Sequence, residues 1–205
     1  MSGDPQHEEA GLAGVVLAGG RSVRFRGEKA SALLGGKPLL MWAVERLRSV
    51  CAVVAVNARP GTEAESLAQA AGLAVLHDAP GDAAGPLAGV RVGLQWAASL
   101  GARALAVSPC DAPLLPDDLY RRLVAAAGEG AALAETRDGP QPLCALWPVS
   151  ALPALVSALA GGAHPATWRM LESLGAQRVR FEDAAAFANL NTRADLESIA
   201  QRYQR

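Results

Sequence analysis

Residues 15–29 read VVLAGGRSVRFRGEK, and this stretch decides the fold class because it joins a buried strand to a glycine turn and a cluster of cations. The apolar run that ends at Leu17 is typical of a strand buried on both faces. Gly19 and Gly20 let backbone amides approach an anion closely. Four cations follow within nine residues, and they are Arg21, Arg24, Arg26 and Lys29.

Apolar runs of four to six residues alternate with longer amphipathic stretches along the rest of the chain. Strands are predicted at Ala13–Leu17, Ala52–Asn57, Leu73–Leu76, Arg103–Ser108, Ala131–Glu135, Cys144–Trp147 and Gln177–Phe181. Helices are predicted at Leu39–Arg48, Glu63–Ala71, Leu87–Ser99, Asp117–Ala127, Thr167–Leu174 and Thr192–Gln201. Apolar strands separated by helices predict the α/β class, with a mostly parallel sheet in a three-layer α/β/α sandwich.

The composition indicates one globular domain with no general affinity for polyanions. The chain has 205 residues, of which 51% are hydrophobic, and a formal net charge of −1. We therefore expect a single domain over residues 11–205, a disordered segment at 1–10, and no binding of nucleic acid or membrane. The three cysteines are widely spaced, which favours a reduced, cytoplasmic protein over a disulfide framework or a zinc site.

The glycine loop does not match the common phosphate-binding motifs. The pattern is neither the dinucleotide-binding GxGxxG nor the P-loop GxxxxGK[ST]. Two simpler interpretations stay open, since Gly19-Gly20 could be a plain turn and the arginines could be solvated surface residues. The combination of amide donors with four cations nevertheless favours a triphosphate as the bound anion.

Further polar side chains follow other predicted strands. Asn57, Asp78 and Asp111 each come at or just after the end of an apolar run, and ligands of open α/β sheets bind at the carboxyl ends of strands. A carboxylate there suits Mg²⁺, which needs only one or two protein oxygens besides substrate phosphates. The structural alternative for Asp111 is a helix N-cap, but Asp117 and Asp118 stand closer to the start of the predicted helix.

Five motifs, in order, resemble the nucleotidyltransferases that attach a nucleotide to molybdopterin, and most closely the molybdenum cofactor guanylyltransferases. The motifs are LAGGRSVRFRGEK at 17–29, GGKPLL at 35–40, HDAPGDAAGPLAGV at 77–90, SPCDAPLL at 108–115 and FANLNTRADL at 187–196. The resemblance extends from about Gly14 to Ile199. It implies a Rossmann-like nucleotidyltransferase fold and the transfer of GMP from GTP to the terminal phosphate of molybdopterin, with release of pyrophosphate.

The resemblance also implies roles for individual residues. Lys29, Asp111 and Arg24 are expected to act in catalysis, with Asp111 as the Mg²⁺ ligand. Substrate-binding positions are expected at Leu17, Ala18, Gly19, Gly20, Lys29, Asn57, Asp78, Gly85, Gly89, Asp111, Asn189 and Asn191. One departure affects the loop, because Arg26 stands where the family usually has glycine, and this leaves the path of the loop around Arg24 open. Transient contact with proteins that deliver molybdopterin or mature molybdoenzymes is a further expectation.

The nucleotide is the least determined part of the expected reaction. Related enzymes that use CTP commonly read LAAG, so Gly19 favours a purine by leaving room beside the loop. Two alternatives remain, namely a nucleotidyltransferase of the same fold that uses CTP or a sugar phosphate, and a non-catalytic nucleotide-binding adaptor. In the last motif, Thr192 is predicted to cap the final helix, with Asp195 at the capping-box position.

Overall fold

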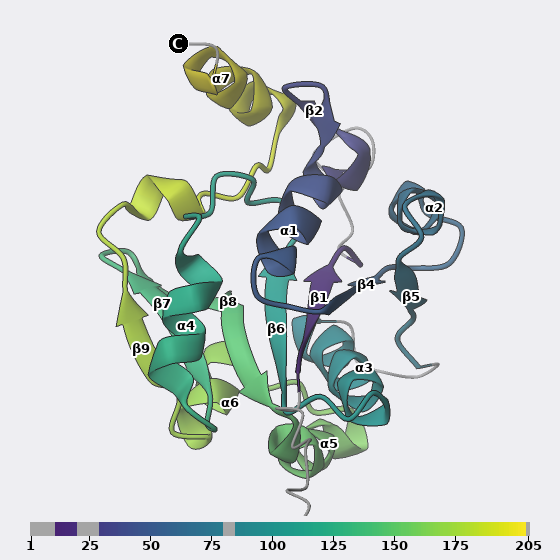
Figure 1. Cartoon of the computed structure of the whole chain (residues 1–205), viewed down its shortest axis with the longest axis vertical. Helices are drawn as coiled ribbons and strands as arrows, with labels where there is room; N and C mark the ends of the chain where they lie inside the picture. Colours follow the sequence, from purple (N-terminus) through teal and green to yellow (C-terminus); the bar gives the residue numbers. More distant parts are fainter. Residues whose placement is uncertain (1–10, 20–28, 80–84, 204–205) are drawn as a thin grey trace, which may run out of the picture.

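The computed structural model describes residues 11–19, 29–79 and 85–203, and it is built around one seven-stranded sheet (Figure 1). Across the sheet the strands are β5 (Ala74–Leu76), β4 (Val53–Asn57), β1 (Leu12–Leu17), β6 (Ala104–Pro109), β8 (Gly139–Pro148), β7 (Ala132–Thr136) and β9 (Gln177–Arg180). β1 and β6 are buried along nearly their whole length, because each is covered on both faces.

The sheet is mostly parallel, as predicted, with one antiparallel strand. The pairs β5–β4, β4–β1, β1–β6 and β7–β9 are parallel, whereas β8 runs antiparallel to both β6 and β7. The short strand predicted at Cys144–Trp147 is wrong in extent, because β8 has ten residues and begins at Gly139. A two-residue loop between Thr136 and Gly139 joins β7 to β8, so the chain turns back without a crossover helix.

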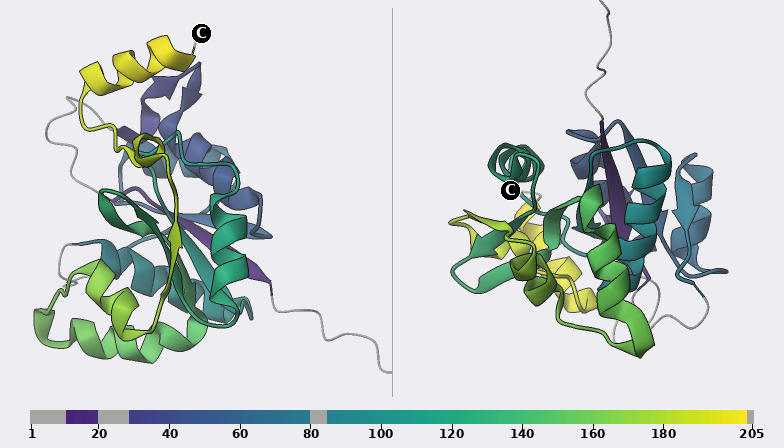
Figure 2. Two further views of the ribbon diagram at one scale, coloured as in Figure 1. Left: turned by 90° about the vertical axis from the view of Figure 1, so that its left-hand side faces the viewer. Right: turned by 90° about the horizontal axis from the view of Figure 1, so that it is seen from below.

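Helices cover both faces of the sheet and give the predicted three layers (Figure 2). One hydrophobic cluster lies under α1 (Leu39–Arg48), α2 (Glu63–Ala70) and α4 (Leu119–Ala127). The cluster on the opposite face lies under α3 (Pro86–Ser99), α5 (Leu152–Leu159) and α6 (Thr167–Ser173). Each apolar face of the sheet is thus buried by helices, which explains why the strands carry apolar residues on both sides.

The prediction missed α5 and a small hairpin. The hairpin pairs β2 (Leu33–Leu34) with β3 (Lys37–Pro38), and it lies next to α7 (Arg193–Tyr203) at one end of the molecule (Figure 1). A third cluster joins these parts through Leu34, Leu39 and Leu190. None of the described helices combines the length and the apolar character that a membrane span requires.

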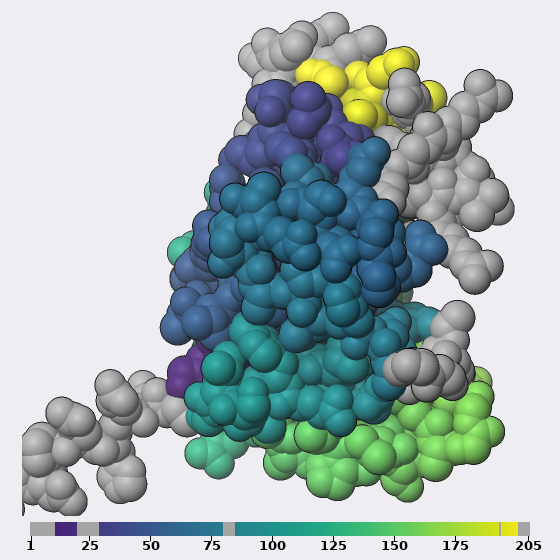
Figure 3. Space-filling view, turned by 90° about the vertical axis from the view of Figure 1, so that its right-hand side faces the viewer, coloured from purple at the N-terminus to yellow at the C-terminus, as the bar shows by residue number. Residues whose placement is uncertain are grey.

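Helix α3 lies unusually close to the middle of the sheet. A Cβ atom built on Gly93 would approach Leu105 Cδ2 to 2.8 Å, and one on Gly89 would approach Leu17 Cδ2 to 2.8 Å. Glycines at these positions let the helix backbone rest on β1 and β6. In the space-filling view, α2 and α3 form one continuous surface between the ends formed by α5 and α7 (Figure 3).

Candidate active site

The carboxyl ends of three adjacent strands form the base of the site. Leu17 at the end of β1 is in register with Asn57 at the end of β4 and with Pro109 at the end of β6. The backbone N–H of Ala18 then donates a 2.8 Å hydrogen bond to the carbonyl of Asn57. The chain leaving β1 is therefore fixed to β4 at the point where Gly19 follows.

Lys29, Asp111 and Asn191 meet through a single ammonium group. Lys29 Nζ donates to Asp111 Oδ2 at 3.0 Å and to Asn191 Oδ1 at 2.8 Å, across sequence separations of 82 and 162 residues. The side chains of Lys29 and Asp111 are 16% and 20% exposed, so water screens this ion pair less than it screens a surface pair. Three residues predicted from separate motifs thus lie together.

Asn191 is held in place by hydrogen bonds on both sides of it. The backbone N–H of Leu190 donates to the carbonyl of Asp111 at 2.8 Å, and the Leu190 side chain is buried. Asp195 Oδ2 accepts from the backbone N–H groups of Asn191 and Thr192, while Thr192 Oγ1 accepts from the N–H of Asp195. The predicted capping box is confirmed, and it lowers the pKa of the Asp195 carboxyl through these backbone bonds.

A second polar pair lies at the end of β4. Asn57 is 5% exposed, and its Nδ2 donates to Asp78 Oδ1 at 2.9 Å and to the carbonyl of Leu76 at 3.3 Å. A Cβ atom on Gly89 would lie 2.5 Å from Asn57 Oδ1, so the glycine lets α3 pack directly against this amide. Asp78, by contrast, is exposed at the edge of the sheet.

The oxygen atoms around Lys29 can also hold a hard cation. Asp111 Oδ2 and Asn191 Oδ1 converge on one ammonium position, and a carboxylate with an amide oxygen is a suitable partial ligand set for Mg²⁺ when substrate phosphates complete it. Among residues 11–19, 29–79 and 85–203, no three His, Cys, Asp or Glu side chains form a metal-binding group. A metal held by Asp111 and Asn191 would therefore need further oxygen ligands, which a bound phosphate can supply.

Cys110 is unsuited to act as a nucleophile although it precedes Asp111. Burial of its thiol, together with the charge of Asp111, raises the pKa to about 12 despite the lowering effect of Lys29. The thiol is therefore protonated near neutral pH. Burial likewise raises the pKa of Cys51 to about 12.

Gly85 lies next to a histidine that the sequence did not single out. A Cβ atom on Gly85 would lie 1.8 Å from His164 Nε2, so this ring points directly at the N-cap of α3. Neither ring nitrogen is exposed, and neither has a hydrogen-bond partner within the described parts of the chain. No local sequence pattern marks this contact, because it joins the α5–α6 connection to a distant helix.

The remaining predicted residues are placed as follows. Asn189 precedes Leu190 in the same extended segment, and its side chain is exposed. Gly20 and Arg24, and with them the Arg26 departure, lie outside the described residues. Asp118 occupies the N-cap of α4, but its side chain makes no capping hydrogen bond there and instead pairs with Arg122 at 3.7 Å. Its expected capping role is therefore wrong.

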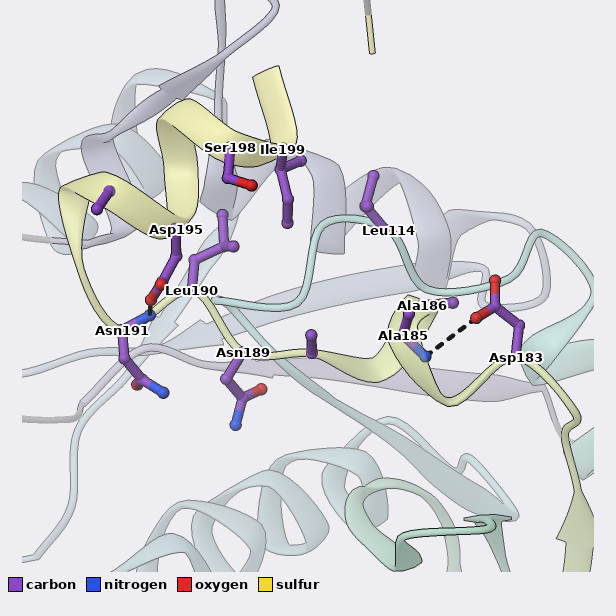
Figure 4. A pocket seen from close by; sticks show the side chains of 12 residues that line it. Leu114, Asp183, Ala185, Ala186, Asn189, Leu190, Asn191, Asp195, Ser198 and Ile199 are labelled. Carbon is purple, nitrogen blue, oxygen red and sulfur yellow. Dashed lines mark hydrogen bonds between the residues drawn. The ribbon is translucent and has the colours of Figure 1, made fainter. Parts of the chain in front are cut away.

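A groove of about 780 Å³ adjoins Asn191 (Figure 4). In the close-up, the amides of Asn189 and Asn191 point to one side of their segment, whereas Leu190 points to the other side, where Leu114 lies. The other lining residues come from the segment before Asn189 and from α7, and they are Asp183, Ala185, Ala186, Ala188, Ala194, Asp195, Ser198 and Ile199. No sequence pattern indicates this groove.

Comparison with known proteins agrees with the resemblance found in the motifs. Residues 14–179 match the family described as the MobA-like NTP transferase domain. A molybdenum cofactor guanylyltransferase from Cereibacter sphaeroides is 43% identical over 187 residues, covering 90% of this chain and 93% of its own. One from Cupriavidus taiwanensis is 39% identical, covering 91% and 95%.

Solved structures share the fold at lower sequence identity. The molybdopterin-guanine dinucleotide biosynthesis protein A from Archaeoglobus fulgidus has a TM-score of 0.74 at 24% identity, with 94% of this chain and 98% of that chain covered. A 4-diphosphocytidyl-2C-methyl-D-erythritol synthase from Anaerococcus prevotii also has a TM-score of 0.74, at 12% identity, covering 95% and 96%. The fold alone therefore does not distinguish the nucleotide.

Proposed function

Because this chain belongs to the MobA-like NTP transferase family, we propose that it transfers GMP from GTP to the terminal phosphate of molybdopterin and releases pyrophosphate. The guanylyltransferase relatives, 43% and 39% identical over about nine-tenths of the chain, support this assignment over CTP-using or non-catalytic alternatives. The product would be the molybdopterin guanine dinucleotide.

The meeting of Lys29, Asp111 and Asn191 is the observation that carries the proposal. An adaptor that only binds a nucleotide has no need to hold a lysine, a carboxylate and an amide oxygen at one point. Nucleotidyl transfer does need them, because several phosphate charges must be held and neutralised while one bond forms and another breaks. The partial burial of Lys29 and Asp111 makes their ion pair stronger than it would be in water.

The roles of the residues follow from their charges. The acceptor phosphate attacks the α-phosphorus of GTP, a new P–O bond forms, and pyrophosphate leaves with its electron pair. Lys29 holds the β- and γ-phosphates and stabilises the charge that develops on them. Asp111 and Asn191 would hold the cation, and Mg²⁺ bound there would supply charge neutralisation at the α-phosphate. A general base is not required, because a phosphate monoester is already largely ionised at neutral pH.

Asn57, Asp78 and Gly19 provide the nucleoside end of the site. Asn57 is buried and hydrogen-bonded to Asp78, so the Asp78 carboxylate is held at the sheet edge, where it can accept from a ribose hydroxyl or a base amine. The backbone of Gly19 lies next to Asn57, and because Gly19 has no side chain it leaves room for a purine. Gly20 and Arg24 would add a backbone amide and a cation for the phosphates, and Gly85 would bring the start of α3 near the nucleotide.

The proposal has a cellular setting as well. We place the reaction in the cytoplasm, where molybdopterin-delivering and molybdoenzyme-maturation proteins would make transient contact with the chain. Nucleic acid and membranes have no part in the reaction.

A direct assay tests the proposal. Purified protein is incubated with α-labelled GTP, molybdopterin and Mg²⁺, and label in the dinucleotide is measured together with pyrophosphate. Omission of molybdopterin and replacement of GTP by CTP, UTP or ATP are the controls. Transfer of GMP at a rate well above that of CMP is expected, whereas faster transfer from CTP, or binding of GTP without any transfer, would contradict it.

A further inference from the structure

Asp78 follows a strand that is short and lies at the edge of the sheet. β5 has three residues, it pairs with β4 along one side, and none of its side chains is fully buried (Figure 1). The end of such a strand opens easily, because few backbone hydrogen bonds and little apolar surface stabilise it. A carboxylate that must meet a nucleotide at this point therefore needs support from side chains.

His77, the residue before Asp78, supplies a hydrogen bond at the end of β5. Its Nδ1 lies 2.8 Å from the carbonyl oxygen of Ala58, and because a carbonyl only accepts, Nδ1 is the donor. The backbone N–H of Ala58 donates to the carbonyl of Leu76 at 3.0 Å. The imidazole thus provides a donor where a longer β5 would provide a backbone N–H, and it continues the ladder between the two strands.

Glu65 of α2 contacts the opposite edge of the same ring. Glu65 Oε1 lies 3.2 Å from His77 Nε2, and a ring that carries protons on both nitrogens satisfies both oxygen atoms that it faces. Glu65 is itself held at the start of α2, because its Oε2 accepts from the backbone N–H of Gly61 at 2.6 Å. Its backbone N–H donates to Thr62 Oγ1 at 3.4 Å. The ring is therefore held between β4 and the N-terminus of α2.

His77 and Asn57 join the ends of β4 and β5 in both directions. Asn57 reaches from β4 to Asp78 Oδ1 at 2.9 Å and to the carbonyl of Leu76 at 3.3 Å. The His77 ring reaches back from β5 to Ala58, the residue after Asn57. A backbone rotation at His77 would break its bond to Ala58 and would also turn the Asp78 carboxylate away from Asn57.

The exposure of His77 separates this role from that of an ordinary surface ion pair. Its side chain is 41% exposed, and a pair that is open to water contributes little to the free energy of unfolding. A pair that only stabilised α2 would therefore leave nucleotide binding unchanged. A binding site is more sensitive than the fold, because a misplacement of about 1 Å can remove a productive contact.

We propose that His77 is a positioning residue for nucleoside recognition, which fixes the Asp78 carboxylate at the sheet edge, and that Glu65 orients its ring. This inference rests on the proposed function, since it takes Asp78 as a contact of the ribose or base of GTP. His77 itself does not touch the nucleotide. Its effect on GTP binding passes through Asp78.

A double-mutant cycle with a conservative variant tests the proposal. His77→Leu removes both contacts of the ring, whereas His77→Asn keeps a donor near the position of Nδ1 for the Ala58 carbonyl. Each is compared with Asp78→Ala and with the double variant Asp78→Ala/His77→Leu. Glu65→Ala removes the other partner of the ring, and Glu45→Ala is its control, because Glu45 is a helical glutamate that pairs with Lys37. Calorimetric titration gives the Kd for GTP, and thermal melting checks the fold.

The expected result is an effect of His77 that depends on Asp78. His77→Leu should raise the Kd for GTP about three- to tenfold with little change in Tm, and His77→Asn should restore most of the affinity. Glu65→Ala should act in the same direction as His77→Leu, and Glu45→Ala should match wild type. In the Asp78→Ala background, His77→Leu should cause no further loss, because the two residues act as one unit.

Three results would overturn the inference. They are an unchanged Kd in His77→Leu, an Asp78→Ala variant that binds GTP as wild type does, and losses from His77→Leu and Asp78→Ala that simply add. If the cycle behaves as expected but the wild-type protein transfers no GMP, the proposed reaction fails while the role of His77 in GTP binding stands. A wild-type protein that binds no GTP would overturn both.

Discussion

Gly89 of α3 and Asn57 of β4 are packed so closely that a Cβ atom on the glycine would lie 2.5 Å from Asn57 Oδ1. Gly89→Ala should therefore displace Asn57 from Asp78, reduce the free energy of unfolding by about 1–3 kcal/mol and weaken GTP binding. Urea unfolding and calorimetric titration with GTP measure the two effects. Gly93→Ala is the matched control, because its Cβ would crowd Leu105 but not the site. A loss of stability in both variants with equal GTP affinity would contradict a role for Gly89 in the nucleotide site.

Asp111→Asn should reduce kcat by about a hundredfold or more and leave the fold intact. The substitution removes the formal charge at the proposed metal position but keeps the side-chain size. The Mg²⁺ dependence of GMP transfer, together with circular dichroism and thermal melting, measures this effect. Turnover within a few-fold of wild type at equal Mg²⁺ would show that Asp111 is not the essential metal ligand.

Lys29→Ala should weaken GTP binding and slow transfer together, because the ammonium acts on the phosphates in both the bound state and the transition state. Lys37→Ala provides a control for a lysine remote from the site, since Lys37 pairs with Glu45 and lies over the ring of Trp42. GTP titration and kcat/KM are compared for the two variants. Equal behaviour of the two lysine variants would contradict a role for Lys29 in phosphate binding.

Gly19→Ala should cost GTP more than CTP. Among the residues that the structure describes, a Cβ atom there would lie 3.6 Å from Asn57 Oδ1, an ordinary contact that the folded protein tolerates, so a loss specific to GTP would come from the bound nucleotide. One methyl group changes the ratio of kcat/KM values for the two nucleotides by roughly ten- to two-hundredfold. Equal losses with GTP and CTP would show that Gly19 serves the backbone turn alone.

Acid should release α7 before the rest of the molecule unfolds. The backbone hydrogen bonds that lower the pKa of Asp195 stabilise the folded state above the unfolded-state pKa of about 4, and this contribution is lost as pH falls through the folded-state pKa. Hydrogen exchange of amides in α7 should therefore accelerate at low pH in wild type. In Asp195→Asn the exchange should already be fast at neutral pH. If neither low pH nor Asp195→Asn changed the rate of hydrogen exchange in α7, the proposed role of the capping box would be contradicted.

The sequence allowed prediction of features that depend on local pattern. The order of the seven sheet strands and of every helix except α5 followed from hydrophobic periodicity, and the capping box followed from the spacing of Thr192 and Asp195. The antiparallel direction of β8 could not be predicted, because apolar residues on both faces of a strand do not encode whether its neighbour is parallel. The Asp138-Gly139 dipeptide, common in tight hairpins, was the available signal for that reversal.

Features that depend on distant contacts could not be predicted in this way. Lys29, Asp111 and Asn191 were each chosen from their own motif, but only the folded chain shows that one ammonium group contacts both oxygen atoms. The contact of His164 with Gly85 and the groove next to Asn191 arise from packing between segments that are far apart in sequence. No periodicity or spacing within a short window carries that information.

The 162-residue separation between Lys29 and Asn191 has a consequence for the order of folding. Contacts between distant residues form late, because the entropy of closing a long loop must be lost before the contact can stabilise the chain. An intermediate could contain β1, β4, β6 and their helices and still lack the amide that completes the site. Recovery of activity during refolding should then lag behind recovery of secondary structure, and a newly made chain would become an enzyme only at the last stage of its folding.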